Sequence, residues 1–169
     1  IKHSLACEAA MKAIYRRMYP EGNTSDEEKW GIVGLLHDAD YELAKGKPEI
    51  HGLLLFETVK VIPDDIAHAI KAHNYEYTNV HPVTKMDWAI ACADQLTGLI
   101  VAAALIHPDK KLASITPEFI LNRMKEKSFA KGAKREPILL CDRELGISLE
   151  SFVALVLTAM QGIHEELEL

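Results

Sequence analysis

Two histidines and two aspartates stand where a charge is costly. His37 and Asp38 end a segment, residues 31–36, that consists only of apolar residues and glycine. Asp94 lies within AIACADQLTGLIVA, the most apolar stretch of the chain, and His3 begins another apolar helical segment. A polar or charged group that leaves water needs a partner, because its lost hydration is expensive. Taken alone, Asp94 has an ordinary interpretation as a buried hydrogen-bonding residue.

Taken together, the same four residues form a donor set for a metal ion. They stand on three separate apolar segments, so a helical bundle can bring two imidazoles and two carboxylates to one point. This mixed nitrogen and oxygen set suits one or two divalent ions, and the residue types do not distinguish Mn, Fe, Zn, Co, Ni or Mg. Such a set also leaves coordination positions open for water and substrate.

Two further histidines stand at predicted helix ends. His51 lies in EIHG and His73 in KAHN. Taken singly, His51 could cap a helix, and His73 could be a cation at the carboxyl end of a helix dipole. The remaining histidines are expected on the surface or in loops: His68, His81, His107 and His164.

The elements that must position these residues are predicted to be helices, because apolar residues recur at helical spacing and no run alternates as a strand does. Ser25 and Glu28 fit a capping box, Pro63 suits a first helical position, and Gly146 suits a helix stop. The segment 75–82 is expected to be non-helical. Helices are expected up to about residue 20, over about 25–38, 49–59, 63–73 and 83–106, from 116, and over 134–145 and 148–167.

These helices predict an all-α, single-domain bundle of seven or eight helices over residues 1–169. The metal-site core is expected at about 1–107, with the C-terminal helices of 109–169 packed on it. Leu53 to Phe56 and the last helix offer apolar surface for a homodimer contact.

The ordered set His3, His37-Asp38 and Asp94 resembles the H…HD…D signature of the HD-domain metal-dependent phosphohydrolases. The surrounding sequence, GLLHDADYE, the HG at 51–52, the HN at 73–74 and ADQLTGL, is similar to that of small bacterial HDIG-type proteins. The resemblance runs from residue 3 to about residue 100 and extends weakly to KSFAKGAKRE at 127–136. Ala39-Asp40 departs from the Ile-Gly of the HDIG label, at positions that are not ligands in the family.

The resemblance implies an HD-domain-like fold and a hydrolytic enzyme whose metal-activated water attacks a phosphoester or phosphoanhydride. His51 and His73 match the extra histidines that hold a second metal in binuclear members. Asp38 is the natural bridging carboxylate, and we take Asp38 and Asp40 as the candidate catalytic residues. Asp40 has three open roles: a general acid, a residue that orients a ligand, or a solvated side chain. The first metal's ligands match His3, His37, Asp38 and Asp94.

Positive charge for a phosphorylated substrate is concentrated in one segment. Residues 110–135 hold eight basic and two acidic residues, whereas residues 1–109 and 136–169 each carry a net charge of −6. One interpretation is a solvated helix face that balances acidic neighbours. The other is a phosphate clamp over the metal mouth, formed by Lys111, Lys127, Lys131 and Arg135.

Composition excludes several classes of protein. The net charge of −6 over 169 residues argues against a nucleic-acid polymer as partner, because such binding depends on Lys and Arg. No signal peptide or membrane span is expected. Cys7, Cys92 and Cys141 lack metal-ligand spacing and lie in apolar segments, so they predict buried thiols in the reducing cytoplasm.

The predicted function is therefore a cytoplasmic phosphohydrolase that takes a small, nucleotide-like substrate. The alternative is a non-catalytic module of the same fold that binds metal or ligand in signalling. The intact ligand set speaks against that alternative. A helical nucleic-acid binder rests only on residues 110–135, and the acidic remainder of the chain disfavours it.

Overall fold

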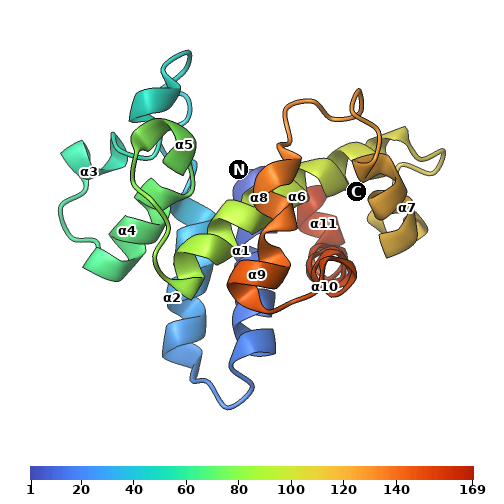
Figure 1. The fold of residues 1–169 in the computed structure, drawn as a ribbon, viewed down its shortest axis with the longest axis horizontal. Helices are drawn as coiled ribbons and strands as arrows, with labels where there is room; N and C mark the ends of the chain where they lie inside the picture. Colours follow the sequence, from blue (N-terminus) through green and yellow to red (C-terminus); the bar gives the residue numbers. More distant parts are fainter.

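The longest helix, α6 (Lys85–Ile106), runs through the middle of the structure, and most of the other helices pack against it (Figure 1). The computed structural model describes residues 1–169, which form helices and no strands. The all-α prediction is confirmed. Helix α6 begins at a capping box in which the Thr84 and Asp87 side chains each pair with the other's backbone N–H, so both orphan amides are satisfied.

The chain contains six helices of eight residues or more and five of four or five residues. The long helices besides α6 are α1 (Lys2–Met18), α2 (Thr24–Leu36), α4 (Asp64–Ala72), α7 (Pro117–Met124) and α10 (Leu149–Gln161). The short ones are α3 (Leu55–Thr58), α5 (Tyr75–Thr78), α8 (Arg135–Leu139), α9 (Cys141–Leu145) and α11 (His164–Leu167). Two 3₁₀ turns lie at Pro48–Ile50 and Leu112–Ser114.

This total of eleven α-helices exceeds the seven or eight expected from the sequence, because local breaks interrupt the predicted segments. The expected helix 134–145 divides at Leu140, and the expected helix 148–167 divides after Gln161. Segment 49–59 is mostly turn and 3₁₀ structure, and part of 75–82 is helical. Asn23, not Ser25, caps α2, since its side chain accepts from the Asp26 N–H.

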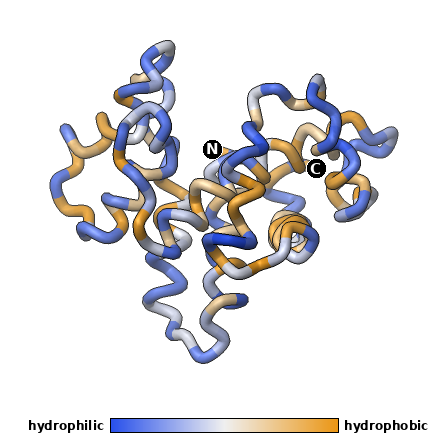
Figure 2. The backbone as a smooth tube through the Cα atoms, in the orientation of Figure 1, coloured by the Kyte–Doolittle hydropathy of each residue, from blue (hydrophilic) through white to orange (hydrophobic).

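Apolar side chains of α1, α4, α6 and α10 form most of one hydrophobic cluster of 34 buried residues. Figure 2 shows the largely hydrophobic α10 in orange. Helix α6 is long and apolar enough to cross a bilayer, but 61% of its most apolar window is buried inside the protein, as in a core helix. Leu55, Phe56 and the apolar face of α10, expected at a dimer contact, pack against this same cluster.

The buried thiols predicted at Cys7, Cys92 and Cys141 are confirmed, and all three are free.

Candidate metal centre

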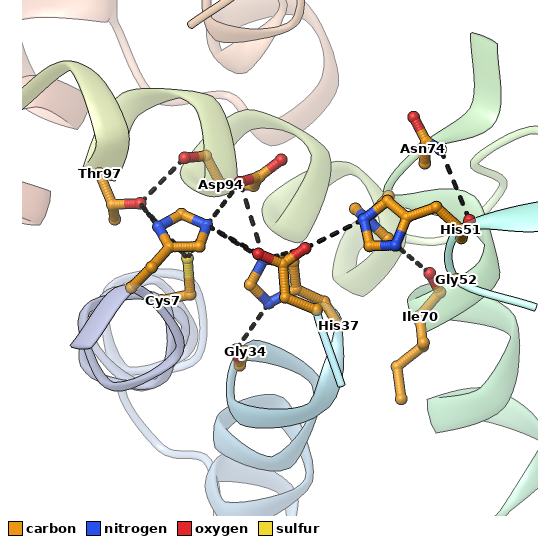
Figure 3. A network of polar contacts seen from close by, with 12 residues as sticks. Cys7, Gly34, His37, His51, Gly52, Ile70, Asn74, Asp94 and Thr97 are labelled. Atoms are coloured by element: carbon orange, nitrogen blue, oxygen red, sulfur yellow. Dashed lines mark hydrogen bonds and ion pairs between the residues drawn. The ribbon is translucent and has the colours of Figure 1, made fainter. Parts of the chain in front are cut away.

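The first group of donors meets where α1, the end of α2 and the middle of α6 come together (Figure 3). His3 Nε2 lies 2.9 Å from Asp94 Oδ1 and 3.3 Å from His37 Nε2. His37 Nε2 lies 3.7 Å from Asp94 Oδ1. Asp38 is 3.6 Å from each imidazole, through Oδ2 to His3 and Oδ1 to His37. The four predicted residues therefore share one point.

These spacings fit a common ion. Donor atoms about 2.1 Å from a metal, at octahedral or tetrahedral angles, lie about 3.0 to 3.4 Å from one another. The observed range of 2.9 to 3.7 Å brackets that interval. Cys7 completes this group of ligand-type residues, with Sγ 3.8 Å from His3 Nε2.

A second group lies beside the first and consists of Asp38, His51 and His73. His51 follows the 3₁₀ turn, and His73 follows the last residue of α4. His51 Nε2 is 3.0 Å from Asp38 Oδ1 and 3.1 Å from His73 Nε2. Asp38 thus contacts both groups, which is the geometry that a bridging carboxylate requires.

In three histidines the Nδ1 atom, which points away from the site, is held by a hydrogen bond to a fixed acceptor, and this leaves Nε2 available to a cation. His37 Nδ1 donates to the Gly34 carbonyl at 2.8 Å, and His73 Nδ1 donates to the Ile70 carbonyl at 2.6 Å. Because a carbonyl only accepts, the lone pair of each neutral ring is on Nε2, which faces the site. Fixed acceptors of this kind are the usual support of metal-bound histidines. His37 Nε2 faces His3 Nε2 at 3.3 Å, and His73 Nε2 faces His51 Nε2 at 3.1 Å. Each facing pair of nitrogens needs a proton or a metal ion between them.

The Asp40 carboxylate fixes the ring of His51, the third of these histidines. Its Oδ1 accepts from His51 Nδ1 at 2.8 Å, and its carboxylate also accepts the backbone N–H groups of Gly52, Leu54 and Leu55. The side chain is 2% exposed. Of the three roles left open by the sequence, this geometry fits the orienting one, because every oxygen already has donors and none faces the pocket.

Two glycines allow the elements to approach this closely. A Cβ at Gly34 would stand 2.5 Å from the Cys7 carbonyl oxygen, so α1 and α2 touch backbone to backbone one turn before His37. Gly52 has a φ of +87°, and a Cβ there would meet the ring of His73 at 3.0 Å. Because these two positions have no side chain, the elements that carry the histidines of both groups can approach closely enough for the histidines to contact their partners.

The electrostatics of the first group favour a bound cation. Burial alone lowers the pKa of His3, but the hydrogen bond with Asp94 and the contact with Cys7 outweigh it and raise the pKa to about 11. Burial likewise lowers the pKa of His37, and Cys7 and Asp94 raise it to about 9. Burial tends to raise the pKa of Asp94, yet its two histidine partners hold it well below 3.8. The metal-free site therefore holds protons where a cation would bind.

The second group is different. Burial and the neighbouring His37 lower the pKa of His73 to about 4, so this imidazole is neutral and ready to ligate at neutral pH. Burial lowers the pKa of His51, but hydrogen bonds to Asp38 and Asp40 reverse the direction and raise it.

Both groups open into one pocket of about 560 Å³. Its lining includes Tyr41, Asn74, Gln95 and the small residues of loop 130–133, and it contains no Lys or Arg. The predicted phosphate ligands lie elsewhere: Lys127, Lys131 and Arg135 line a neighbouring cleft, and exposed Lys111 lines neither. The structure therefore does not place the expected clamp around the metal mouth.

Arg135 illustrates the physical reason. Its guanidinium donates to the carbonyls of Phe129, Ala130 and Ala133, so it holds the loop before α8 instead of facing the pocket. The backbone contacts of a single long side chain are not visible in the sequence.

Sequence reasoning also omitted three residues of the site. Thr97 donates to the Asp94 carbonyl and is 3.4 Å from His3 Nδ1, and Gln95 donates to Asp94 Oδ2 at 2.7 Å. Cys7 stands one helical turn after His3, so helical spacing from a candidate ligand was the available signal.

Comparison of the chain with protein-family models, curated proteins and solved structures found no match.

Proposed function

We propose that this chain is a divalent-metal-dependent phosphohydrolase with an HD-domain-like fold that acts on a small, phosphorylated, nucleotide-like substrate. One observation carries the proposal. Four histidines and two aspartates converge on two adjoining donor groups, and Asp38 belongs to the contacts of both. This donor chemistry, together with the HD resemblance of the sequence, supports hydrolysis by a metal-activated water.

Bound divalent ions would lower the pKa of water toward neutrality and neutralise phosphoryl oxygens. The chain's own residues supply the geometry. Asp38 presents one oxygen toward His3 and the other toward His37 and His51, so it can touch both ion positions. Asp40 and the Ile70 carbonyl fix His51 and His73, which removes ring rotation from the cost of binding.

The pocket lining supports a small substrate. Because no Lys or Arg lines it, the charge of the phosphoryl group would be balanced at the ions, and the pocket itself offers no cationic track to a long polyanion. Tyr41 lies at the rim, 55% exposed, with its ring 5.5 Å from that of His51. An exposed aromatic face beside the donor groups would be a platform on which a base can stack.

The experiment compares metal content and turnover in ligand variants with a matched control. We expect divalent metal to co-purify with the wild type and to raise its melting temperature when added back after chelation. Asp38→Asn, at the residue that contacts both groups, should abolish that rise, and His37→Gln, which belongs to the first group alone, should reduce it. Both variants should abolish any hydrolysis of nucleotides, dinucleoside polyphosphates or generic phosphoesters with Mn²⁺, Co²⁺, Ni²⁺ or Mg²⁺. His164→Gln, on an exposed histidine outside the site, should behave as the wild type.

Absence of metal binding in the wild type would contradict the proposal. Metal binding without turnover in the whole panel would favour the non-catalytic signalling module instead. The cytoplasmic location and a homodimer remain predictions from the sequence.

A further inference from the structure

A second cleft, of about 740 Å³, lies beside the metal pocket, and Ala133 lines both. The cleft is formed by α7, α8, the start of α10 and the loop between α7 and α8. This loop is largely hydrophilic in Figure 2. This volume is within the range of small-molecule sites, about 300 to 1,000 Å³. None of the proposed metal ligands lines it.

Part of the cleft lining is apolar. Its hydrophobic lining comes from Leu121, Met124, Leu139 and Leu149, together with Ala133. Leu139 is 56% exposed, so its side chain is accessible to a ligand. This surface would gain free energy from contact with an apolar ligand body.

The lining also contains four lysines, and two of their ammonium groups have no partner. Lys134 pairs with Glu76, and Lys125 donates to Asn122. Lys127 and Lys131 are exposed and form no ion pair or side-chain hydrogen bond within the chain. Free ammonium groups beside an apolar wall complement an organic anion with an apolar body.

Two carboxylates narrow the ligand class. Glu136 and Glu150 belong to the same lining, so a ligand that is anionic along its whole length would be repelled. A molecule with one anionic end and an uncharged body satisfies both the lysines and the leucines.

The wall between cleft and metal pocket is fixed by hydrogen bonds. Arg135 holds the carbonyls of the loop, and the Lys134 N–H donates to Gln95 Oε1 at 2.8 Å. Gln95 in turn contacts Asp94. The cleft is thus built into the fold, not left by a loose loop.

We propose that this cleft is a second ligand site, which binds a small organic anion with an apolar body through the ammonium groups of Lys127 and Lys131 and the side chain of Leu139. The site needs no metal ion, so its existence does not depend on the proposed hydrolase activity.

The test is a fluorescence titration with 8-anilino-1-naphthalenesulfonate, an anion with an apolar body, in the presence of a chelator. We expect saturable binding by the full chain. The Lys127→Glu/Lys131→Glu double variant should weaken it about tenfold or more, because two ammonium contacts become repulsive. Lys45→Glu/Lys47→Glu, on exposed lysines outside the cleft, should change it less than about twofold.

The apolar contact has its own pair of variants. Leu139→Asn should weaken binding, whereas Leu43→Asn, on a leucine that is 76% exposed and outside the cleft, should not. All substituted side chains are exposed, so thermal unfolding should match the wild type.

Competition distinguishes the natural sources of such an anion. Displacement of the dye by AMP would indicate a nucleotide, and displacement by octanoate would indicate an acyl carboxylate. Failure of both to displace the dye, or equal binding by the cleft variants and their controls, would overturn the proposal. Loss of metal-dependent hydrolysis with intact dye binding would refute only the proposed function.

Discussion

Gly34→Ala is expected to separate the two helices that carry the first donor group. The added Cβ would stand 2.5 Å from the Cys7 carbonyl oxygen and 2.6 Å from Glu8 N, both backbone atoms of α1. Ordinary contact begins at 3.4 Å, so α1 and α2 must move apart by about 0.9 Å. No rotamer change can relieve a clash with backbone.

The magnitude follows from two opposing effects. Overpacking of this kind costs about 1 to 3 kcal/mol, and replacing a helical glycine by alanine returns about 0.5 to 1 kcal/mol. The difference spans about 0 to 2.5 kcal/mol, and its midpoint predicts a net loss of about 1 kcal/mol, or a fall in melting temperature of about 2 to 4 °C. Metal ligation tolerates displacements of only about 0.2 Å, so the first group should lose its ion.

The second donor group predicts a selective result. Asp38, His51 and His73 all lie outside α1, so a second ion should still bind. Melting in chelator gives the stability change, and metal stoichiometry by mass spectrometry gives the site change. Gly98→Ala is the control, because its Cβ would meet nothing within 4 Å, and it should leave stability unchanged or slightly raised. A Gly34→Ala protein with wild-type stability and metal content would refute the close-approach argument.

Three further results are expected. Asp40→Asn should lower stability by about 2 to 4 kcal/mol and weaken the second ion's affinity about 10- to 100-fold, measured by urea unfolding and metal titration; unchanged affinity would remove its orienting role. In chelator, the free energy of unfolding should peak near pH 6.5. The free energy of unfolding falls at higher pH, because His37 and His3 lose the protons that the folded state holds with pKa values of about 9 and 11. It falls at lower pH because His73 has a pKa of about 4 in the folded protein and takes up a proton more readily when the chain unfolds. A profile that is flat from pH 7 to 9 would contradict this. Metal binding at pH 7 should release protons from the His3–His37 pair to an indicator dye, and no release would show that the metal-free site is already deprotonated.

The residue types of the centre were visible in the sequence because burial makes them conspicuous. A His-Asp pair after six apolar or glycine residues, and an aspartate inside the most apolar helix, have no partner within their own segments. Such groups must find one another, so their convergence follows from the cost of burying unpaired charge. Helical periodicity likewise predicted α1, α2, α4 and α6 within a few residues, together with the start of α10.

The position of the basic side chains of residues 110–135 could not be predicted from the sequence, because the order of charges along a chain does not fix where the side chains point. Arg135 contributes to the net positive charge of residues 110–135, yet three backbone carbonyls occupy its guanidinium. Lys127 and Lys131 belong to a neighbouring cleft because the loop before α8 turns them away from the metal pocket.

The sequence by itself determined that the chain is helical and that its histidines and aspartates form a metal-type donor set, because both properties follow from local periodicity and residue chemistry. Only the tertiary structure decided which oxygen and nitrogen atoms face one another. Asp40 shows the reason: its role depends on backbone N–H groups that lie 12 to 15 residues away and are brought to it by the turn at Gly52. Such contacts are set by chain reversal and packing, and no local pattern encodes them.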